Sequence, residues 1–171
     1  MAVRELRFYP DPVLRQQCQE VEAFDQELAG FIDDLAESMY THRGVGLAAP
    51  QVGEPIRVAV VDVAQQEEKP VLFELVNPEI IEASEETSDY EEGCLSFPGE
   101  AELVTRPARV TVRAQDRQGN SFEIKAEGLL ATALQHEIDH LDGVVFIDHI
   151  SRLKRNLVER RMKKRAQEAA L

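Results

Sequence analysis

The sequence predicts an α+β fold in which short, mostly antiparallel strands pack around a central helix and a further helix follows at the C-terminus. Apolar residues recur at helical spacing near both ends of the chain, and short β-branched runs cluster between them. Strands and helices do not alternate as a β-α-β sheet requires. We expect one domain over residues 1–171, since no repeat, low-complexity tract or flexible linker divides the sequence.

The first predicted helix covers residues 25–43. Its apolar positions are three and four residues apart, which places them on one face, and Gly44 is well placed to end the helix. These positions are Leu28, Phe31, Ile32, Leu35 and Met39. The segment is therefore predicted to be an amphipathic helix.

A loop over residues 44–54 and then two buried strands are predicted to follow. Residues 56–63 and 71–76 are rich in β-branched side chains, which is typical of strands. The strongly acidic stretch 82–92 is expected to be exposed.

The second half of the chain begins with a predicted hairpin. Residues 108–114 and 121–126 flank a turn segment that contains Gly119. A second helix is predicted over residues 129–142, and Gly143 marks its end.

The last predicted helix, residues 150–170, is strongly basic. Residues 151–171 hold eight of the 19 basic residues and two of the 32 acidic ones, so this segment carries +6 and the remainder −19. Ile150, Leu153 and Leu157 form a narrow apolar stripe on it. Such a helix is either a solvated surface element or a docking element for nucleic acid or another anionic surface.

The composition also bears on the compartment. No apolar stretch approaches the roughly 20 residues that a membrane span needs, and charged residues interrupt the first ten positions. We therefore expect a cytoplasmic protein without membrane contact. In that reducing compartment Cys18 and Cys94 are expected to remain free thiols.

The sharpest local signal is the segment His-Glu-Ile-Asp-His at residues 136–140. Residues four apart on an α-helix are separated by about 6 Å along the axis and point to nearly the same side, so His136 and His140 can bind one metal ion. Glu137 lies beside that site and suits proton transfer from a metal-activated water. We therefore expect the central helix to bind a metal.

A catalytic centre of this kind normally has three protein ligands, so a third must come from elsewhere. Phe146 stands where a metzincin protease requires histidine. Glu159 is a candidate, but its basic surroundings indicate a solvated helix face. Cys94, in the segment 92–96, is the better candidate, since a metal stabilises its thiolate. Cys18 has no ligand type beside it and is predicted to be a buried core residue.

A third constellation is Gly-Val-Gly-Leu-Ala-Ala-Pro-Gln at residues 44–51. Its small residues permit close approach of the backbone to a ligand, and Gln51 carries an amide donor suited to a developing oxyanion. A plain helix-to-strand turn would show the same composition.

Together, residues 44–51, 92–96 and 135–143 resemble the three signature motifs of the peptide deformylase family in their order and approximate separation. The C-terminal helix and the lack of insertions resemble the type 1 form of Gram-negative bacteria. The resemblance implies a single catalytic domain. It also implies a metal-dependent hydrolase that removes the formyl group from the N-terminal formyl-methionine of newly made polypeptides and releases formate. This is N-terminal processing in protein biosynthesis.

The resemblance also implies a role for each candidate residue. The metal ligands would be Cys94, His136 and His140. Glu137 would act as general base and acid, and Gln51 with the backbone N–H of Leu95 would bind the oxyanion. Family behaviour implies one Fe²⁺ ion per chain, which Zn²⁺, Ni²⁺ or Co²⁺ can replace, whereas the ligand set alone favours zinc.

The substrate pocket is expected to form around the metal-binding face. Val45, Leu129 and Ala133 are predicted to line an apolar slot for methionine, and Leu129 and Ala133 share the face of the two histidines. Gly46 is expected to offer backbone hydrogen bonds to the substrate peptide, or else to be a turn glycine.

Several charged residues have two interpretations. Glu92 and Arg106 either pair to orient the Cys94 loop or are solvated surface charges. His42 and His149 are predicted to be surface or loop residues, since neither has ligand spacing to the main pair.

The expected partners are formyl-methionyl nascent peptides, and the resemblance favours ribosome contact through the basic C-terminal helix of a monomeric enzyme. Two alternatives remain. A zinc endopeptidase would use the two histidines and a remote carboxylate, and ligation by Cys94 would exclude it. A nucleic-acid-binding protein with a structural metal is opposed by the charge of −19 outside residues 151–171, which repels phosphates.

Overall fold

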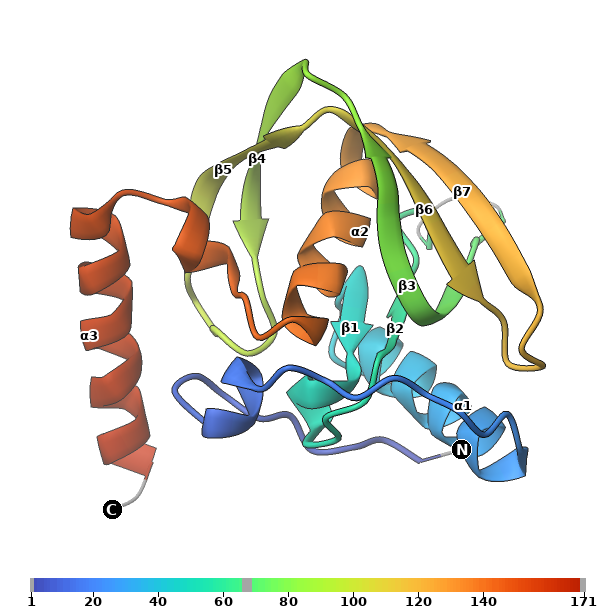
Figure 1. Cartoon of the computed structure of the whole chain (residues 1–171). Coiled ribbons are helices and arrows are strands. Elements are labelled where there is room, and N and C mark those ends of the chain that lie inside the picture. The colour runs from blue at the N-terminus through green and yellow to red at the C-terminus, as the bar shows by residue number, and fades with distance from the viewer. Residues whose placement is uncertain (1, 66–68, 170–171) are drawn as a thin grey trace.

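The computed structural model describes residues 2–65 and 69–169. Within these ranges the chain forms three α-helices and two antiparallel sheets of five and two strands (Figure 1). Helix α2 lies between the two sheets, and α3, at the C-terminus, lies beyond the two-stranded sheet. The predicted α+β class, with mostly antiparallel strands around a central helix, is confirmed.

The larger sheet has the strand order β1-β2-β3-β6-β7. Its strands are β1 (Gly46–Ala48), β2 (Val58–Val61), β3 (Phe73–Ala83), β6 (Arg109–Gln115) and β7 (Ser121–Glu127). The hairpin of β6 and β7 is confirmed, and Gly119 adopts a positive φ of 90° in its turn. Strand β3 is longer than predicted, because it continues past Asn77, whose φ of 50° and the following shift in register accommodate Pro78.

The two-stranded sheet consists of β4 (Thr87–Gly93) and β5 (Ala101–Pro107). The acidic stretch 82–92 is mostly exposed, as predicted, but it also forms the end of β3 and most of β4. Its last residue is an exception, since Glu92 is buried. Charged side chains in this sheet therefore face inward as well as outward.

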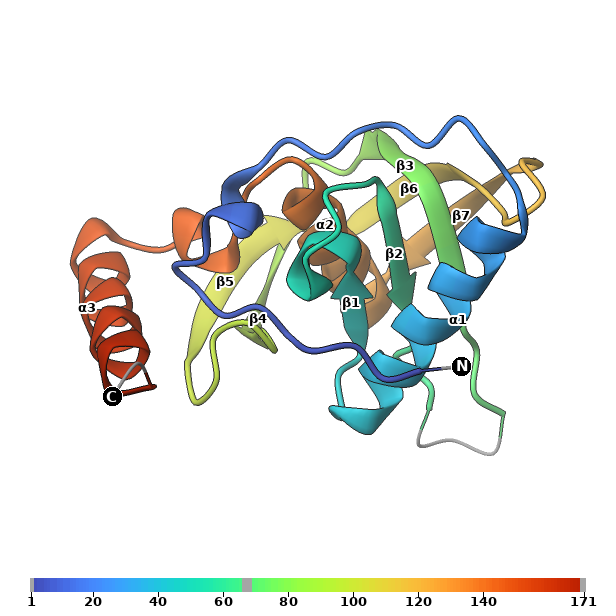
Figure 2. The ribbon, with the colours of Figure 1, turned by 90° about the horizontal axis from the view of Figure 1, so that it is seen from below.

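Helices α1 (Gln26–Thr41) and α2 (Gly128–Leu141) cover opposite faces of β2, which is buried on both sides (Figure 2). Val58 and Val60 belong to the cluster around α1, whereas Ala59 and Val61 belong to the cluster around α2. This alternation follows from the two-residue period of a strand.

The ends of these helices show which local signals matter. Asp25 caps α1, because its carboxylate accepts a hydrogen bond from the N–H of Leu28 at 2.9 Å. The helix ends at Thr41, and Arg43, with a φ of 61°, takes the left-handed conformation there, so Gly44 does not serve that purpose. Gly143 does so for α2, with a φ of 75°.

Helix α3 (Arg152–Ala169) begins two residues later than predicted, and the predicted last residue, Ala170, lies outside the described residues. Val158 and Met162 form its buried face. Of the predicted apolar stripe, Leu153 and Leu157 are 71% and 41% exposed, whereas Ile150 lies before the helix and packs against a core cluster. In the described part of the chain, no helix combines the length and apolar character that crossing a membrane demands.

Candidate metal centre and active site

Three potential metal ligands converge at the centre of the fold. Cys94 follows directly after β4, and His136 and His140 stand one turn apart on α2. The Nε2 atom of His140 lies 3.4 Å from Cys94 Sγ and 3.2 Å from His136 Nε2, and all three ligand atoms lie within 4.8 Å of one another. Of the described residues, these three form the single group with metal-binding geometry.

This arrangement fits a transition-metal ion. Tetrahedral coordination at ordinary metal–nitrogen and metal–sulfur lengths separates the ligand atoms by about 3.3–3.6 Å. Two of the separations observed here are close to those values. Thiolate and imidazole are also ligand types that zinc, iron and nickel accept. Cys94, His136 and His140 are therefore a candidate metal site.

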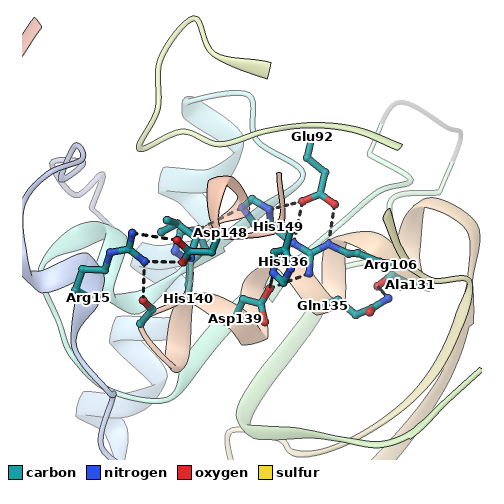
Figure 3. Close-up of polar contacts among 12 residues, drawn as sticks. Arg15, Glu92, Arg106, Ala131, Gln135, His136, Asp139, His140, Asp148 and His149 are labelled. Carbon is teal, nitrogen blue, oxygen red and sulfur yellow. Dashed lines mark hydrogen bonds and ion pairs between the residues drawn. The ribbon is translucent and has the colours of Figure 1, made fainter. Parts of the chain in front are cut away.

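A largely buried network of charged side chains supports His136 through its Nδ1 atom (Figure 3). The Nδ1 atom of His136 lies 3.0 Å from Glu92 Oε1, which fixes the imidazole orientation. Arg106 donates two hydrogen bonds to Glu92, at 2.7 and 3.0 Å, and one to Asp139 at 2.8 Å. His149 lies 2.8 Å from the same Asp139 carboxylate.

Glu92 and Arg106 are each only 5% exposed, so their interpretation as solvated surface charges is wrong and their predicted pairing is present. Burial raises the pKa of Glu92, but hydrogen bonds from His136 and Arg106 outweigh it and lower the pKa to about 2. His149 lies in a short 3₁₀ segment, as its loop assignment implied, but it takes part in the network. Sequence spacing gave no signal for that contact.

Glu137 is buried beside the candidate metal ligands, and among the described residues its Oε1 atom has no hydrogen-bond partner. Its burial raises its pKa to about 7, with a smaller contribution from Glu92 and opposition from His136. The carboxylate packs directly on Gly46, where a Cβ atom would lie 2.5 Å from Glu137 Oε2. Gly46 is therefore the residue that makes room for this carboxylate.

Gln51 presents its amide N–H₂ group to the site. Its Oε1 atom accepts a hydrogen bond from the N–H of Ala48 at 3.0 Å, which fixes the amide orientation. Its Nε2 atom then faces Cys94 Sγ at 3.4 Å and Ser96 Oγ at 3.2 Å. A fixed donor of this kind can stabilise negative charge that develops beside the metal. The contact with Ser96 was not expected from the sequence.

A cavity of about 420 Å³ opens beside these groups. All predicted catalytic and substrate-binding residues line it, as do Cys94 and His136, whereas His140 does not. The predicted lining residues are Val45, Gly46, Gln51, Leu95, Leu129, Ala133 and Glu137. Sequence reasoning missed Arg43, Phe97, Glu100 and Thr132, which carried no recognisable local signal.

The remaining candidates lie elsewhere. Cys18 is a buried core residue, as predicted, and its burial raises the pKa of the thiol to about 11. Glu159, the alternative third ligand, accepts hydrogen bonds from the Tyr9 hydroxyl and from Arg155, each at 3.2 Å. The structure thus brings Cys94, and not Glu159, to the two histidines.

Comparison with known proteins agrees with this geometry. A family model described as polypeptide deformylase matches residues 3–156. The peptide deformylase of Mesorhizobium japonicum is 51% identical over 99% of this chain and 97% of its own length, and that of Brucella suis gives the same values.

Solved structures give the same answer. A peptide deformylase from Legionella pneumophila superposes with a TM-score of 0.89 at 44% identity, covering 99% of this chain and 98% of its own. The Ehrlichia chaffeensis enzyme in complex with actinonin gives 0.91 at 40% identity, covering 96% and 98%. These findings confirm the predicted resemblance to the family. The chain belongs to the polypeptide deformylase family.

Proposed function

We propose that this protein hydrolyses the N-terminal formyl group of formyl-methionine in newly made polypeptides and releases formate. Its membership of the deformylase family supports the reaction type. The observation that carries the proposal is the convergence of Cys94, His136 and His140 next to the buried Glu137, which lines the cavity together with Cys94 and His136.

We propose one Fe²⁺ ion per chain at these three ligands, with Zn²⁺, Ni²⁺ or Co²⁺ able to replace it. When bound, such an ion supplies Lewis acidity that polarises the formyl carbonyl and acidifies water. Metal analysis of protein purified without oxygen would identify the ion, and an iron content well below that of zinc would contradict this part of the proposal.

The chain's own residues move the proton and stabilise the charge. Glu137 accepts a proton from the attacking water and returns it to the leaving amine as the carbon–nitrogen bond breaks. Gln51 Nε2 and the backbone N–H of Leu95 donate hydrogen bonds to the oxyanion that develops from the formyl oxygen. The Gln51 amide is held ready for this by its bond from Ala48.

The rest of the cavity selects the substrate. Val45, Leu129 and Ala133 offer apolar surface for the methionine side chain, and Gly46 also lines the cavity, where its backbone can bind the substrate. Backbone recognition would not discriminate among the residues that follow methionine. This suits an enzyme that processes many polypeptides.

Replacement of Glu137 tests the proposed chemistry. We expect Glu137→Ala to keep its metal and to lose about 10²–10⁴-fold in kcat for a formyl-methionyl peptide, because the proton carrier is gone. Glu123→Gln, an exposed carboxylate replacement on β7, is the control and should retain full turnover. Near-normal turnover by Glu137→Ala with the wild-type metal content would disprove its role.

We also propose that the enzyme is a cytoplasmic monomer that contacts the ribosome through α3. The support is a set of exposed basic residues on that helix, here called the outer basic face, which comprises Arg152, Arg160, Lys163 and Lys164. Changing Arg160, Lys163 and Lys164 to glutamine should weaken salt-sensitive co-sedimentation with ribosomes. Unchanged co-sedimentation would contradict the contact, and a solution mass well above 19.3 kDa would contradict the monomer.

A further inference from the structure

We propose that helix α3 positions one wall of the active-site cavity by holding Glu100 with Arg161 and Arg165. This inference rests on the proposed function, because the wall concerned lies in the cavity assigned to the formylated substrate. We name residues 94–100 the wall loop. It begins at the candidate ligand Cys94 and ends at Glu100, and most of its residues line the cavity.

The Glu100 carboxylate is buried and depends on α3 for its partners. Arg161 contacts both carboxylate oxygens, with Nε at 3.0 and 3.1 Å and a terminal nitrogen at 2.7 Å. Arg165 lies 3.1 Å from the same carboxylate and also donates a hydrogen bond to the carbonyl of Pro98. In the described part of the chain, every charged partner of Glu100 comes from α3.

Apolar packing also joins α3 to the wall loop. Val158 and Met162 of α3 belong to the cluster that contains Phe97, a cavity-lining residue in the middle of the wall loop. The Phe97 ring stacks on Tyr9 with ring centroids 4.8 Å apart, and Tyr9 donates its backbone N–H to Ser96 at 3.0 Å. Helix α3 therefore supports the wall loop through both ion pairs and apolar packing.

The consequence of losing the arginines follows from the burial of Glu100. A carboxylate that is buried without a partner is strongly disfavoured, so the loop would move to hydrate it. Backbone hydrogen bonds from Glu100 to Phe97 and from Phe97 to Cys94, at 3.1 and 2.9 Å, link that end of the loop to the rest. Phe97 and Glu100 line the cavity, and neither is a candidate metal ligand or a proposed proton or oxyanion group. We therefore expect the displacement to weaken substrate binding more than chemistry.

The test compares kinetic constants of the metal-loaded enzyme. We expect Arg161→Ala with Arg165→Ala to raise KM for a formyl-methionyl peptide about three- to tenfold while kcat and metal content stay within twofold, the pattern of lost binding. The conservative change of both arginines to lysine should recover part of the loss. In a Glu100→Gln background, removing the arginines should have a smaller effect, because no buried charge is stranded.

A matched control is available on the opposite side of the molecule. Arg109→Ala with Arg113→Ala also removes two arginines from carboxylate pairs, but these pairs are exposed and lie on β6, so KM should not change. If the α3 double variant folds poorly, Arg161→Ala alone is measured in its place, with hydrogen exchange of residues 94–100 expected to be faster than in the wild type.

The outcomes separate this inference from a purely stabilising role and from the proposed function. A variant that melts at a lower temperature but keeps the wild-type KM and the wild-type exchange of the wall loop would overturn the inference. An equal effect of arginine removal in the Glu100→Gln background would do so as well. Failure of the wild-type enzyme to release formate would instead refute the proposed function.

Discussion

Gly46 offers the sharpest test of how this site is built, because a single methyl group there would occupy the space of the Glu137 side chain. An added Cβ atom would lie 2.5 Å from Glu137 Oε2, 2.8 Å from Cδ and 2.9 Å from Cγ. Ordinary contacts of this kind require about 3.4 Å or more. Gly46→Ala must therefore push the carboxylate about 1 Å away from its position.

A shift of that size has a predictable kinetic cost. Misplacing a catalytic group by about 1 Å lowers the rate about 10²-fold, so we expect kcat/KM of Gly46→Ala to fall by that factor. Stability should change much less, because the φ of Gly46 is not positive and the carboxylate can swing toward the open cavity. A bound metal should remain, since the three atoms nearest to the added Cβ all belong to Glu137 and none to a candidate metal ligand.

The assay measures formate release, metal content and the free energy of unfolding on the same preparation. Gly30→Ala is the matched control, since its added methyl group meets nothing within 4 Å on the surface of α1. It should leave kcat/KM unchanged and stabilise the fold by about 0.5–1 kcal/mol, as alanine does in a helix. A Gly46→Ala enzyme with kcat/KM within threefold of the wild type would refute the steric argument.

Three further predictions concern the support of His136, the end of α2 and the buried thiol of Cys18. Arg106→Met should lower the free energy of unfolding by about 3–5 kcal/mol, because it leaves the buried Glu92 without its partner. It should also weaken metal retention against a chelator about 10- to 100-fold. Unchanged retention would contradict the role of Arg106 and Glu92 in orienting His136. Gly143→Ala should lower the free energy of unfolding, measured by urea titration, by more than about 1 kcal/mol. The φ of Gly143 is 75°, and an added Cβ atom would lie 2.6 Å from the Arg15 carbonyl oxygen. An unchanged free energy of unfolding would contradict this clash. Cys18 should resist alkylation in the native state at pH 8. Because its pKa is raised from 9.0 to about 11 in the fold, the stability it contributes is complete below pH 9 and is lost as the pH rises toward 11, which unfolding measured across that range would show.

Much of the site could be predicted from the sequence because its chemistry is encoded locally. Two histidines four residues apart share a helix face in any fold that makes the segment helical, so their convergence needed no tertiary information. The small residues of 44–51 likewise predicted a backbone that can approach a ligand closely. The third candidate ligand could not be predicted from local periodicity, because Cys94 reaches the histidines only after β4 and β5 have placed its loop against α2.

Other features depended on neighbours that are remote in the sequence. Glu92 and Arg106 look like surface charges along the chain, yet the register of β4 and β5 turns both inward, where each neutralises the other and Glu92 orients His136. The same holds for α3, where the sequence predicted an apolar stripe of Ile150, Leu153 and Leu157, of which Leu153 and Leu157 are exposed. The tertiary structure buries Val158 and Met162 instead, because that face meets Phe97.

One physical reason separates the features that the sequence predicted from those that only the tertiary structure decided. Periodicity along a chain states which side chains share a face, and it therefore revealed the helices, most strands and the pair of metal-binding imidazoles. It does not state which face meets another surface. That choice is made by the free energy of burying apolar area and pairing buried charges across distant segments, so the wall loop, the support of His136 and the packing of α3 emerged with the fold alone.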